Sequence, residues 1–249
     1  EILRCLVGSE MCIRDREYMK EKKKRDWKSI IGITVLISFI APIAFIIYKI
    51  IVSPTTNVEQ IEGVRVKTDY ILMLTQCVLG VIAFFLPNML SKKLKIVIPT
   101  NMYIVYVLFL WGAVFLGEVR NFYYRVPHWD TILHTCSGAM LGALGFSFIN
   151  ILNKHEKVHV ELAPIFVAIF AFAFAVSLGV IWEIYEFTFD GILGLNMQKF
   201  ALENGTQLVG RAALADTMED LIVDCIGAFT MSTICLLYTS PSPRDISGS

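Results

Sequence analysis

The run HWDTILHTCSGAMLGALG, residues 128–145, places an acid and a histidine at the start of an otherwise apolar stretch. At helical spacing Asp130, His134, Gly138 and Gly142 follow one another by one turn and share one face. That face is polar at its start, and afterwards it consists of glycines, which have no side chain. Glycines let the backbone of a neighbouring helix come close, as small-residue faces do in membranes. The pattern predicts a membrane helix whose polar start is held against other helices.

The composition of the whole chain is that of a membrane protein. Of its 249 residues 55% are hydrophobic, and the charged residues balance to a formal net charge of zero. Soluble domains of ordinary composition are less apolar than this. The lipid bilayer is therefore the first partner that we expect, and the lack of a basic excess predicts no nucleic-acid partner.

The two ends of the chain differ in character from the rest. Residues 5–16 and 235–245 resemble translated sequencing-adapter read-through of the kind found in metagenomic reading frames. Such segments must be set aside before the fold is considered. We therefore interpret residues 1–18 and 235–249 as non-native and residues 19–234 as a single transmembrane domain.

Helix-forming apolar segments fill most of this domain. About 20 apolar residues are needed to cross a bilayer as one helix. We predict an all-α fold, a polytopic membrane bundle of about six transmembrane helices, at about 29–52, 70–90, 96–116, 131–152, 162–185 and 216–234. Pro42 predicts a kink in the first helix. The segment 187–215 is expected to be interfacial or re-entrant and packed on protein.

The distribution of lysine and arginine predicts the orientation. A basic run at residues 20–28 precedes the first helix, and Lys92, Lys93 and Lys95 lie in the turn after the second. Cytoplasmic loops carry the excess of positive charge in membrane proteins. Both the N-terminus and the C-terminus of the domain are therefore predicted to be cytoplasmic, in the inner membrane of a bacterium.

This topology gathers polar residues from four helix ends on the extracytoplasmic side. The set comprises Glu118, Arg120, Asn121, Asp130, His134, Glu183, Glu186, Asp190, Asp216, Glu219, Asp220 and Asp224. An ionised acid at the centre of a membrane helix costs about 2.5 to 3.5 kcal/mol, so several together require partners, protonation or a bound cation. We therefore predict a functional pocket at this side of the bundle.

Carboxylates with one histidine can divide acid and base roles or hold a divalent metal ion. The candidate catalytic residues, and equally the candidate metal ligands, are His134, Glu183, Asp220 and Asp224. The candidate substrate-binding residues are Arg120, Asp130, Glu186 and Arg211.

Structural interpretations of the same residues stay open. Asp216 followed by Glu219 fits a capping box at the start of the last helix, and Asp130 fits an N-cap. His134 fits a simple hydrogen bond to a neighbouring helix. The buried acids of the last two helices also fit ion pairs with Arg120 or Arg211.

Three motifs carry a resemblance to known proteins. Asp130-x3-His134, Trp182-Glu183-Ile184-Tyr185-Glu186 and Asp216-Thr217-x2-Asp220-x3-Asp224-x2-Gly227 are similar to those of the YjdF-like family of uncharacterised membrane-spanning proteins. A more distant similarity is to VanZ-like proteins, which are associated with resistance to teicoplanin and often carry Asn where this chain has Asp224. The resemblance implies a polytopic membrane fold and no established reaction.

Three classes of function fit these observations. The first is an enzyme or binding protein for a lipid-linked or envelope substrate, although a GxSxG motif is absent from the sequence. The second is a proton- or cation-coupled transporter, which usually places its site at the midplane between inverted repeats. The third is a structural or assembly protein. A charge-neutral replacement of Asp224 should be tolerated only in the third class.

Overall fold

Helices make up most of the described chain, which in this computed structural model comprises residues 27–55, 64–94, 98–153 and 162–239. They are α2 (Trp27–Ile40), α3 (Ile43–Val52), α4 (Lys67–Leu94), α5 (Thr100–Leu110), η1 (Trp111–Val119), α6 (Phe122–Arg125), α7 (Trp129–Asn153), α8 (Pro164–Leu193), η2 (Gly210–Leu214) and α9 (Ala215–Thr239). Within these ranges the only strand-like pairing is an isolated bridge between Ala201 and Gln207. The predicted all-α fold is confirmed.

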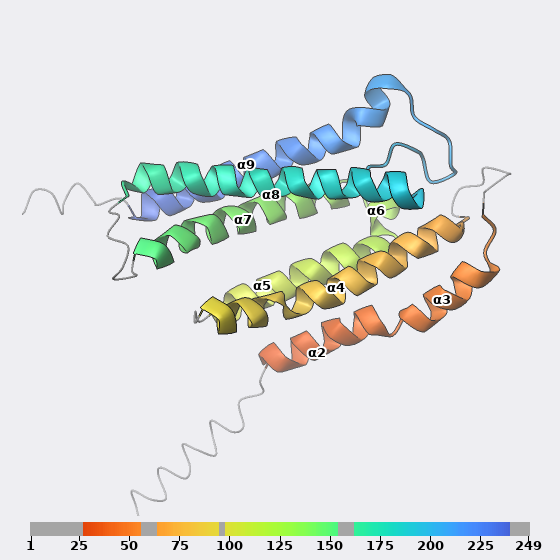
Figure 1. The fold of residues 1–249 in the computed structure, drawn as a ribbon, viewed down its shortest axis with the longest axis horizontal. Helices are drawn as coiled ribbons and strands as arrows, with labels where there is room; N and C mark the ends of the chain where they lie inside the picture. The colour runs from red at the N-terminus through yellow and green to blue at the C-terminus, as the bar shows by residue number, and fades with distance from the viewer. Residues whose placement is uncertain (1–26, 56–63, 95–97, 154–161, 240–249) are drawn as a thin grey trace, which may run out of the picture.

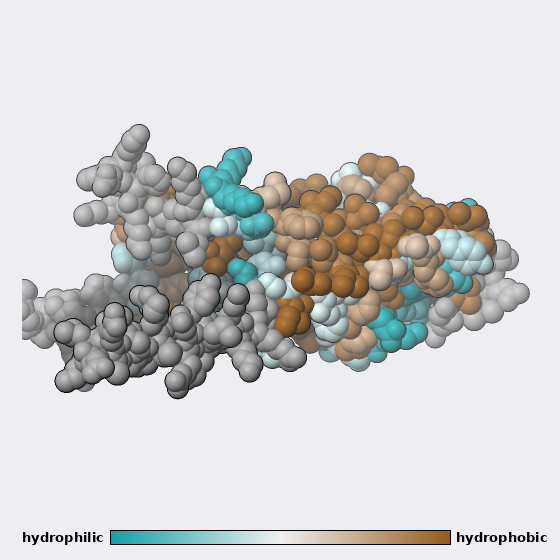
Figure 2. All heavy atoms as spheres, turned by 90° about the horizontal axis from the view of Figure 1, so that it is seen from below, coloured by the Kyte–Doolittle hydropathy of each residue, from teal (hydrophilic) through white to brown (hydrophobic). Residues whose placement is uncertain are grey.

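Six helical stretches are long and apolar enough to cross a membrane. They are Trp27–Val52, Lys67–Lys93, Thr100–Val119, Trp129–Ile149, Pro164–Leu193 and Gly210–Thr239. Many large apolar side chains are exposed on them, among them Ile51, Phe187 and Ile192. Figure 2 shows such side chains over much of the middle of the face that it presents. Apolar exposure on this scale suits lipid rather than water, and the predicted six-helix membrane bundle is confirmed.

α8 runs further than the sequence predicts, and so do α4 and α9. The predicted fifth span ends at about residue 185, whereas α8 continues to Leu193 and ends at Gly194, which has the left-handed conformation that favours glycine. The added turns carry Glu186 and Asp190, and both acids are buried. Polarity near the end of α8 therefore marks a site inside the protein rather than the end of the helix. α9 continues into the segment that we interpret as non-native.

Our interpretation of the two ends of the chain as non-native mostly involves residues that the structure does not describe. Residues 1–18 are among them, and so is most of the basic run 20–28. The described chain starts with α2 and finishes with α9 at the same end of the bundle (Figure 1). The side of the membrane on which this end lies stays a prediction.

Two prolines in the first half of the chain have different effects. At Pro42 the first span breaks into α2 and α3, which confirms the predicted kink. Pro87 lies inside α4 without interrupting it. Because proline has no N–H, the carbonyl of Ala83 one turn earlier lacks its helical donor, and the Tyr106 hydroxyl of α5 donates to it at 2.8 Å instead. This bond ties α5 to α4.

The bundle consists of two halves of three spans each (Figure 1). The first half contains α2 with α3, α4, and α5 with η1, and the second contains α7, α8 and α9. Each half has an apolar core, which includes Phe39, Ile46, Cys77 and Val107 in the first and Val167, Ala168 and Ala171 in the second. The halves touch where η1 packs on α7. There the Trp129 indole donates to the Gly112 carbonyl at 3.3 Å.

The segment 194–209 connects α8 to η2 at one end of the bundle, which we call the loop end. α8 finishes at this end, and α7 and α9 begin there (Figure 1). Asp190 anchors the segment, because its two carboxylate oxygens accept the backbone N–H groups of Met197 at 2.8 Å and of Gln198 at 3.0 Å. The chain is thereby folded back toward the starts of α7 and α9.

Candidate functional site

α7 and α9 lie side by side and run in the same direction from the loop end (Figure 1). Two glycines set their separation. A side chain at Gly138 would overlap the backbone carbonyl of Asp224, and one at Gly227 would overlap the carbonyl of Thr135. The two helices therefore touch backbone to backbone, as small residues allow within membranes. This contact confirms the expectation that the glycine face of α7 is covered by another helix.

The contact brings the polar starts of the two helices together. His134 on α7 faces Asp220 on α9, and one turn nearer the loop end Asp130 and Asp216 bind the same lysine. Asp224 lies one turn further along α9. We call these five residues, Asp130, His134, Asp216, Asp220 and Asp224, the acid–histidine cluster.

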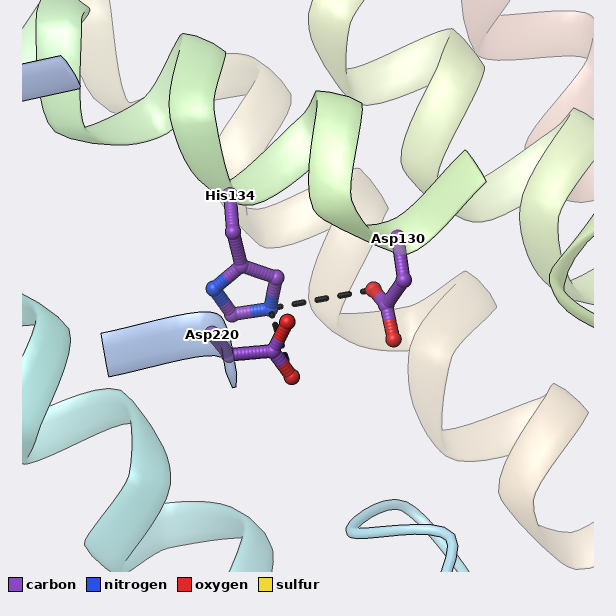
Figure 3. Close-up of side chains that lie close together, drawn as sticks. All are labelled: Asp130, His134 and Asp220. Carbon is purple, nitrogen blue, oxygen red and sulfur yellow. Dashed lines mark ion pairs between the residues drawn. The ribbon is translucent and has the colours of Figure 1, made fainter. Parts of the chain in front are cut away.

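His134 is buried among three carboxylates. Its Nδ1 lies 3.4 Å from Asp224 Oδ2. Its Nε2 lies 3.7 Å from Asp130 Oδ1 and 3.8 Å from Asp220 Oδ2 (Figure 3). Asp224 is held in turn by the Ser137 hydroxyl, which donates to Oδ1 at 2.9 Å. Each ring nitrogen of His134 therefore faces an acid whose position is fixed by a helix backbone.

Lys199 from the segment 194–209 completes the cluster. Its ammonium forms ion pairs with Asp130 and with Asp216, the latter at 3.1 Å, and lies 5.5 Å from the centre of the Tyr123 ring. Burial alone would lower the pKa of this ammonium, but the charges of the two carboxylates outweigh burial and raise the pKa above its ordinary value. Lys199 is therefore positively charged at neutral pH and compensates part of the acidic charge.

The capping interpretations of Asp216 and Asp130 are wrong. Each residue lies inside its helix, which begins one residue earlier, and each carboxylate pairs with Lys199. Glu219, the second member of the expected capping box, accepts a hydrogen bond from Thr131 of α7 at 3.1 Å. α9 continues directly from η2, so its first turn follows helical backbone instead of a loop. The polar side chains of this turn therefore pair with other parts of the chain instead of capping the helix.

α8 contributes three buried acids. The Trp182 indole N–H donates to Glu186 at 3.0 Å, and Asp190 accepts the two backbone N–H groups of the loop end. Glu183 is different: it is 5% exposed, and neither carboxylate oxygen accepts a hydrogen bond from the described residues. The nearby Gln198 amide donates to Thr217 at 2.9 Å. A buried carboxylate without a partner is costly, so Glu183 requires a further donor or cation.

A cavity of about 830 Å³ lies between the two halves of the bundle. At the loop end it is lined by charged residues, which include Asp130, His134, Glu186, Lys199 and Asp224. Further in it is lined by Leu79, Gly80, Ala83, Leu110, Leu141 and Leu178. From Asp69 to Ala83 the lining extends along α4 for about 20 Å at the helical rise. The cavity is therefore charged at one end and apolar at the other.

η1 forms one wall of this cavity. It is a π-helix, a wider winding than the α-helix that is uncommon in proteins and recurs at functional sites. Its residues Ala113 and Glu118 line the cavity, and the Glu118 carbonyl accepts a hydrogen bond from the Arg65 guanidinium at 3.3 Å. The site thus draws on both halves of the bundle.

The structure brings together most of the predicted site residues. Asp130, His134, Asp220 and Asp224 lie in the acid–histidine cluster, and Glu183 and Glu186 lie beside it on α8. Arg120 and Arg211 are exposed and lie outside the cavity, and within the described chain neither forms an ion pair. The interpretation that these arginines pair with the buried acids is therefore wrong: Asp220 and Asp224 face His134, and Lys199 pairs with Asp130 and Asp216.

Sequence reasoning missed Lys199 and Ser137 as members of the site. Lys199 is the only charged residue in the sequence from 191 to 202. A single charge in an otherwise uncharged stretch is a signal that could have drawn attention to it. Ser137 gives no such signal, because Ser147 and Ser177 are also serines in apolar helices and bond only to carbonyls of their own helix.

Three members of the cluster are spaced as ligands of a metal ion would be. One ligand atom each of Asp130, His134 and Asp220 lies within 4.8 Å of the others. The predicted set also contained Glu183 and Asp224. In the structure Asp130 lies in the group of three instead, and Asp224 faces the other nitrogen of the histidine.

Comparison with known proteins agrees with this membrane architecture. Residues 31–241 match the family model described as "Predicted membrane protein (DUF2238)". The chain belongs to this family. It is also similar to an uncharacterized protein of Thermotoga maritima, with 36% identity over 132 residues that cover 51% of this chain and 59% of that relative. No solved structure matches the chain.

Proposed function

We propose that the protein binds an amphiphilic, lipid-linked ligand of the bacterial cytoplasmic membrane in the cavity between its two halves. The observation that carries this proposal is the division of the cavity into a charged end and an apolar end. An amphiphile has the same division, and pockets generally combine an apolar lining with a few polar groups that fix orientation. Its headgroup would lie near Asp130 and Lys199 and its chain near Leu141 and Leu178.

The predicted orientation supports a ligand from the outer leaflet, because the loop end would then face the outside. The resemblance to YjdF-like and, more distantly, VanZ-like proteins supports a role in the cell envelope. A chemical step on the ligand would have His134 available as an acid or base, with its ring oriented by Asp224.

Proton-coupled transport is the alternative, since His134 with its carboxylates is the kind of group that relays protons in membranes. The cavity argues against it. Beyond the acid–histidine cluster the lining passes to Leu79, Ala83 and Leu110, and it holds no titratable residue at that depth. A proton path across the membrane would require polar groups to continue there.

Native mass spectrometry of detergent-purified protein offered an extract of bacterial membrane lipids tests the proposal. Wild type is expected to retain an amphiphile, and Leu178→Trp, which fills the apolar end of the cavity, is expected to lose it. Ile181→Trp is the matched control. Ile181 lies on the same helix, is 58% exposed on the outer surface of the bundle and does not line the cavity.

Two results would contradict amphiphile binding. One is a wild-type protein that retains nothing from the extract. The other is equal retention by the two tryptophan variants, which would place the bound lipid on the outer surface.

A further inference from the structure

We infer that Asp130, His134 and Asp220 form a binding site for a divalent transition-metal ion at the charged end of the cavity. The ligands are Asp130 Oδ1, His134 Nε2 and Asp220 Oδ2, the three atoms that face one another in Figure 3. Asp130 and His134 also line the cavity, so the ion is accessible from it. The inference does not depend on amphiphile binding.

The spacing of the three atoms fits a small metal ion. His134 Nε2 lies 3.7 Å from Asp130 Oδ1 and 3.8 Å from Asp220 Oδ2. Two ligands that are each about 2.1 Å from a tetrahedral ion lie about 3.4 Å apart. Side-chain movements of a few tenths of an ångström therefore bring each carboxylate to coordination distance with the histidine, and the two carboxylate oxygens lie within 4.8 Å of each other.

Asp224 prepares His134 for this role. It lies at Nδ1, on the opposite side of the ring from the two ligand carboxylates, and Ser137 holds it in place. A proton on Nδ1 that is donated to Asp224 leaves the Nε2 lone pair free for the ion, which is the usual arrangement of metal-binding histidines. Gly179 of α8 makes room for Asp224, since a Cβ there would lie 2.6 Å from Oδ2.

Glu183 is an independent indication that a cation binds at this position. Gly179 contacts Asp224, and Glu183 lies one turn further along the same face of α8. Because α8 runs opposite to α9 (Figure 1), this turn brings Glu183 toward Asp220. Its carboxylate interacts electrostatically with His134 and is almost fully buried, and the amide near it, that of Gln198, donates to Thr217. A divalent ion bound at His134 would provide a positive charge close to the Glu183 carboxylate.

Lys199 is compatible with an ion at this position. The Lys199 ammonium pairs with Oδ2 of Asp130 and with Asp216. The other oxygen of Asp130, Oδ1, faces His134. One imidazole with two carboxylates suits Zn²⁺ or Mn²⁺. Mg²⁺ and Ca²⁺ prefer ligand sets made of oxygen alone.

Metal content after chelation and reloading tests the inference. Protein purified in detergent is stripped with EDTA, dialysed against Zn²⁺ or Mn²⁺, and measured by elemental mass spectrometry. Wild type is expected to hold one equivalent per chain, and His134→Ala and Asp220→Asn are expected to lose it. Asp224→Asn should weaken binding by about 10- to 100-fold, as loss of a partner behind a ligating histidine does.

Glu219→Gln is the matched control, because Glu219 is the exposed acid beside Asp220 on the same helix. It is expected to bind as wild type does. Co²⁺-loaded wild type should also show the strong visible absorption of a four-coordinate site, a measurement that does not depend on whether the variants fold.

Less than one tenth of an equivalent in reloaded wild type would overturn the inference, and so would equal losses in Glu219→Gln and Asp220→Asn. His134 would then be a protonated group that bridges the acids. Retained amphiphile in the same preparations would show that the proposed function survives the loss of the metal site, and lost amphiphile with bound metal would show the reverse.

Discussion

At Lys199 a single ammonium joins three separate parts of the chain. It lies in the segment 194–209 and pairs with Asp130 at the start of α7 and with Asp216 at the start of α9. The side chains are each 21% exposed, so the pairs are neither fully solvated nor fully buried. Their contribution should therefore lie between that of surface ion pairs and that of buried ones.

Replacing Lys199 by methionine should leave both carboxylates without a cation and release the loop end. We expect Lys199→Met to lower the free energy of unfolding by about 2 kcal/mol, measured as a lower melting temperature in detergent. Lys93→Met is the control, since Lys93 is exposed at the opposite end of the bundle and should change little. Equal melting of the two variants would show that Lys199 does not stabilise the loop end.

Among the elements, the contact between α7 and α9 decides whether the site forms. It depends on glycine at the point where the two backbones meet, and the members of the acid–histidine cluster on both helices are aligned only if that contact is kept. The sequence predicts the glycine face of α7 and its polar start. It cannot name the partner, because periodicity describes one helix at a time.

Gly138→Ala should separate the two helices, because its Cβ would overlap the Asp224 carbonyl. We expect a loss of about 1 to 3 kcal/mol in stability together with loss of metal binding at His134. Gly191→Ala should be neutral or slightly stabilising, since nothing lies within 4 Å of that position and alanine favours the helix. Thermal melting of both variants checks the difference, and similar melting temperatures would contradict it.

Pro42 and Pro87 show why helix breaks are only partly predictable from sequence. Both are prolines in apolar spans, yet only Pro42 interrupts its helix. At Pro87 the freed carbonyl is satisfied by Tyr106, a residue of another helix. Lys199 is a similar case, since its position depends on the bonds that Asp190 makes to the loop end. Contacts of this kind follow from tertiary structure and not from local pattern.

On the scale of the whole molecule, alternation of the spans explains why the acids meet. Each helix crosses the bundle, so the end of α8 and the starts of α7 and α9 come to the same side, as the sequence predicts. A pocket among these acids is predicted from the sequence, but its apolar end is not, because that part exists only where two separately packed halves fail to close on each other.

Cysteine labelling on intact cells tests the predicted orientation. In a background without the native cysteines, Val209→Cys at the loop end should react with a membrane-impermeant maleimide, since Val209 is 84% exposed. Lys93→Cys at the opposite end should react only after the cells are permeabilised. The reverse pattern would place the loop end in the cytoplasm.

The division of the acid–histidine cluster between α7 and α9 also bears on how the protein is made. α7 is the least apolar of the six spans, and it carries Asp130 and His134. During synthesis it emerges before Lys199 and before the acids of α9, so its polar side chains enter the bilayer ahead of the partners that the rest of the chain supplies in the finished cluster. Membrane insertion of α7 is therefore the step most open to failure, and maturation of the site is a late event that awaits the sixth span.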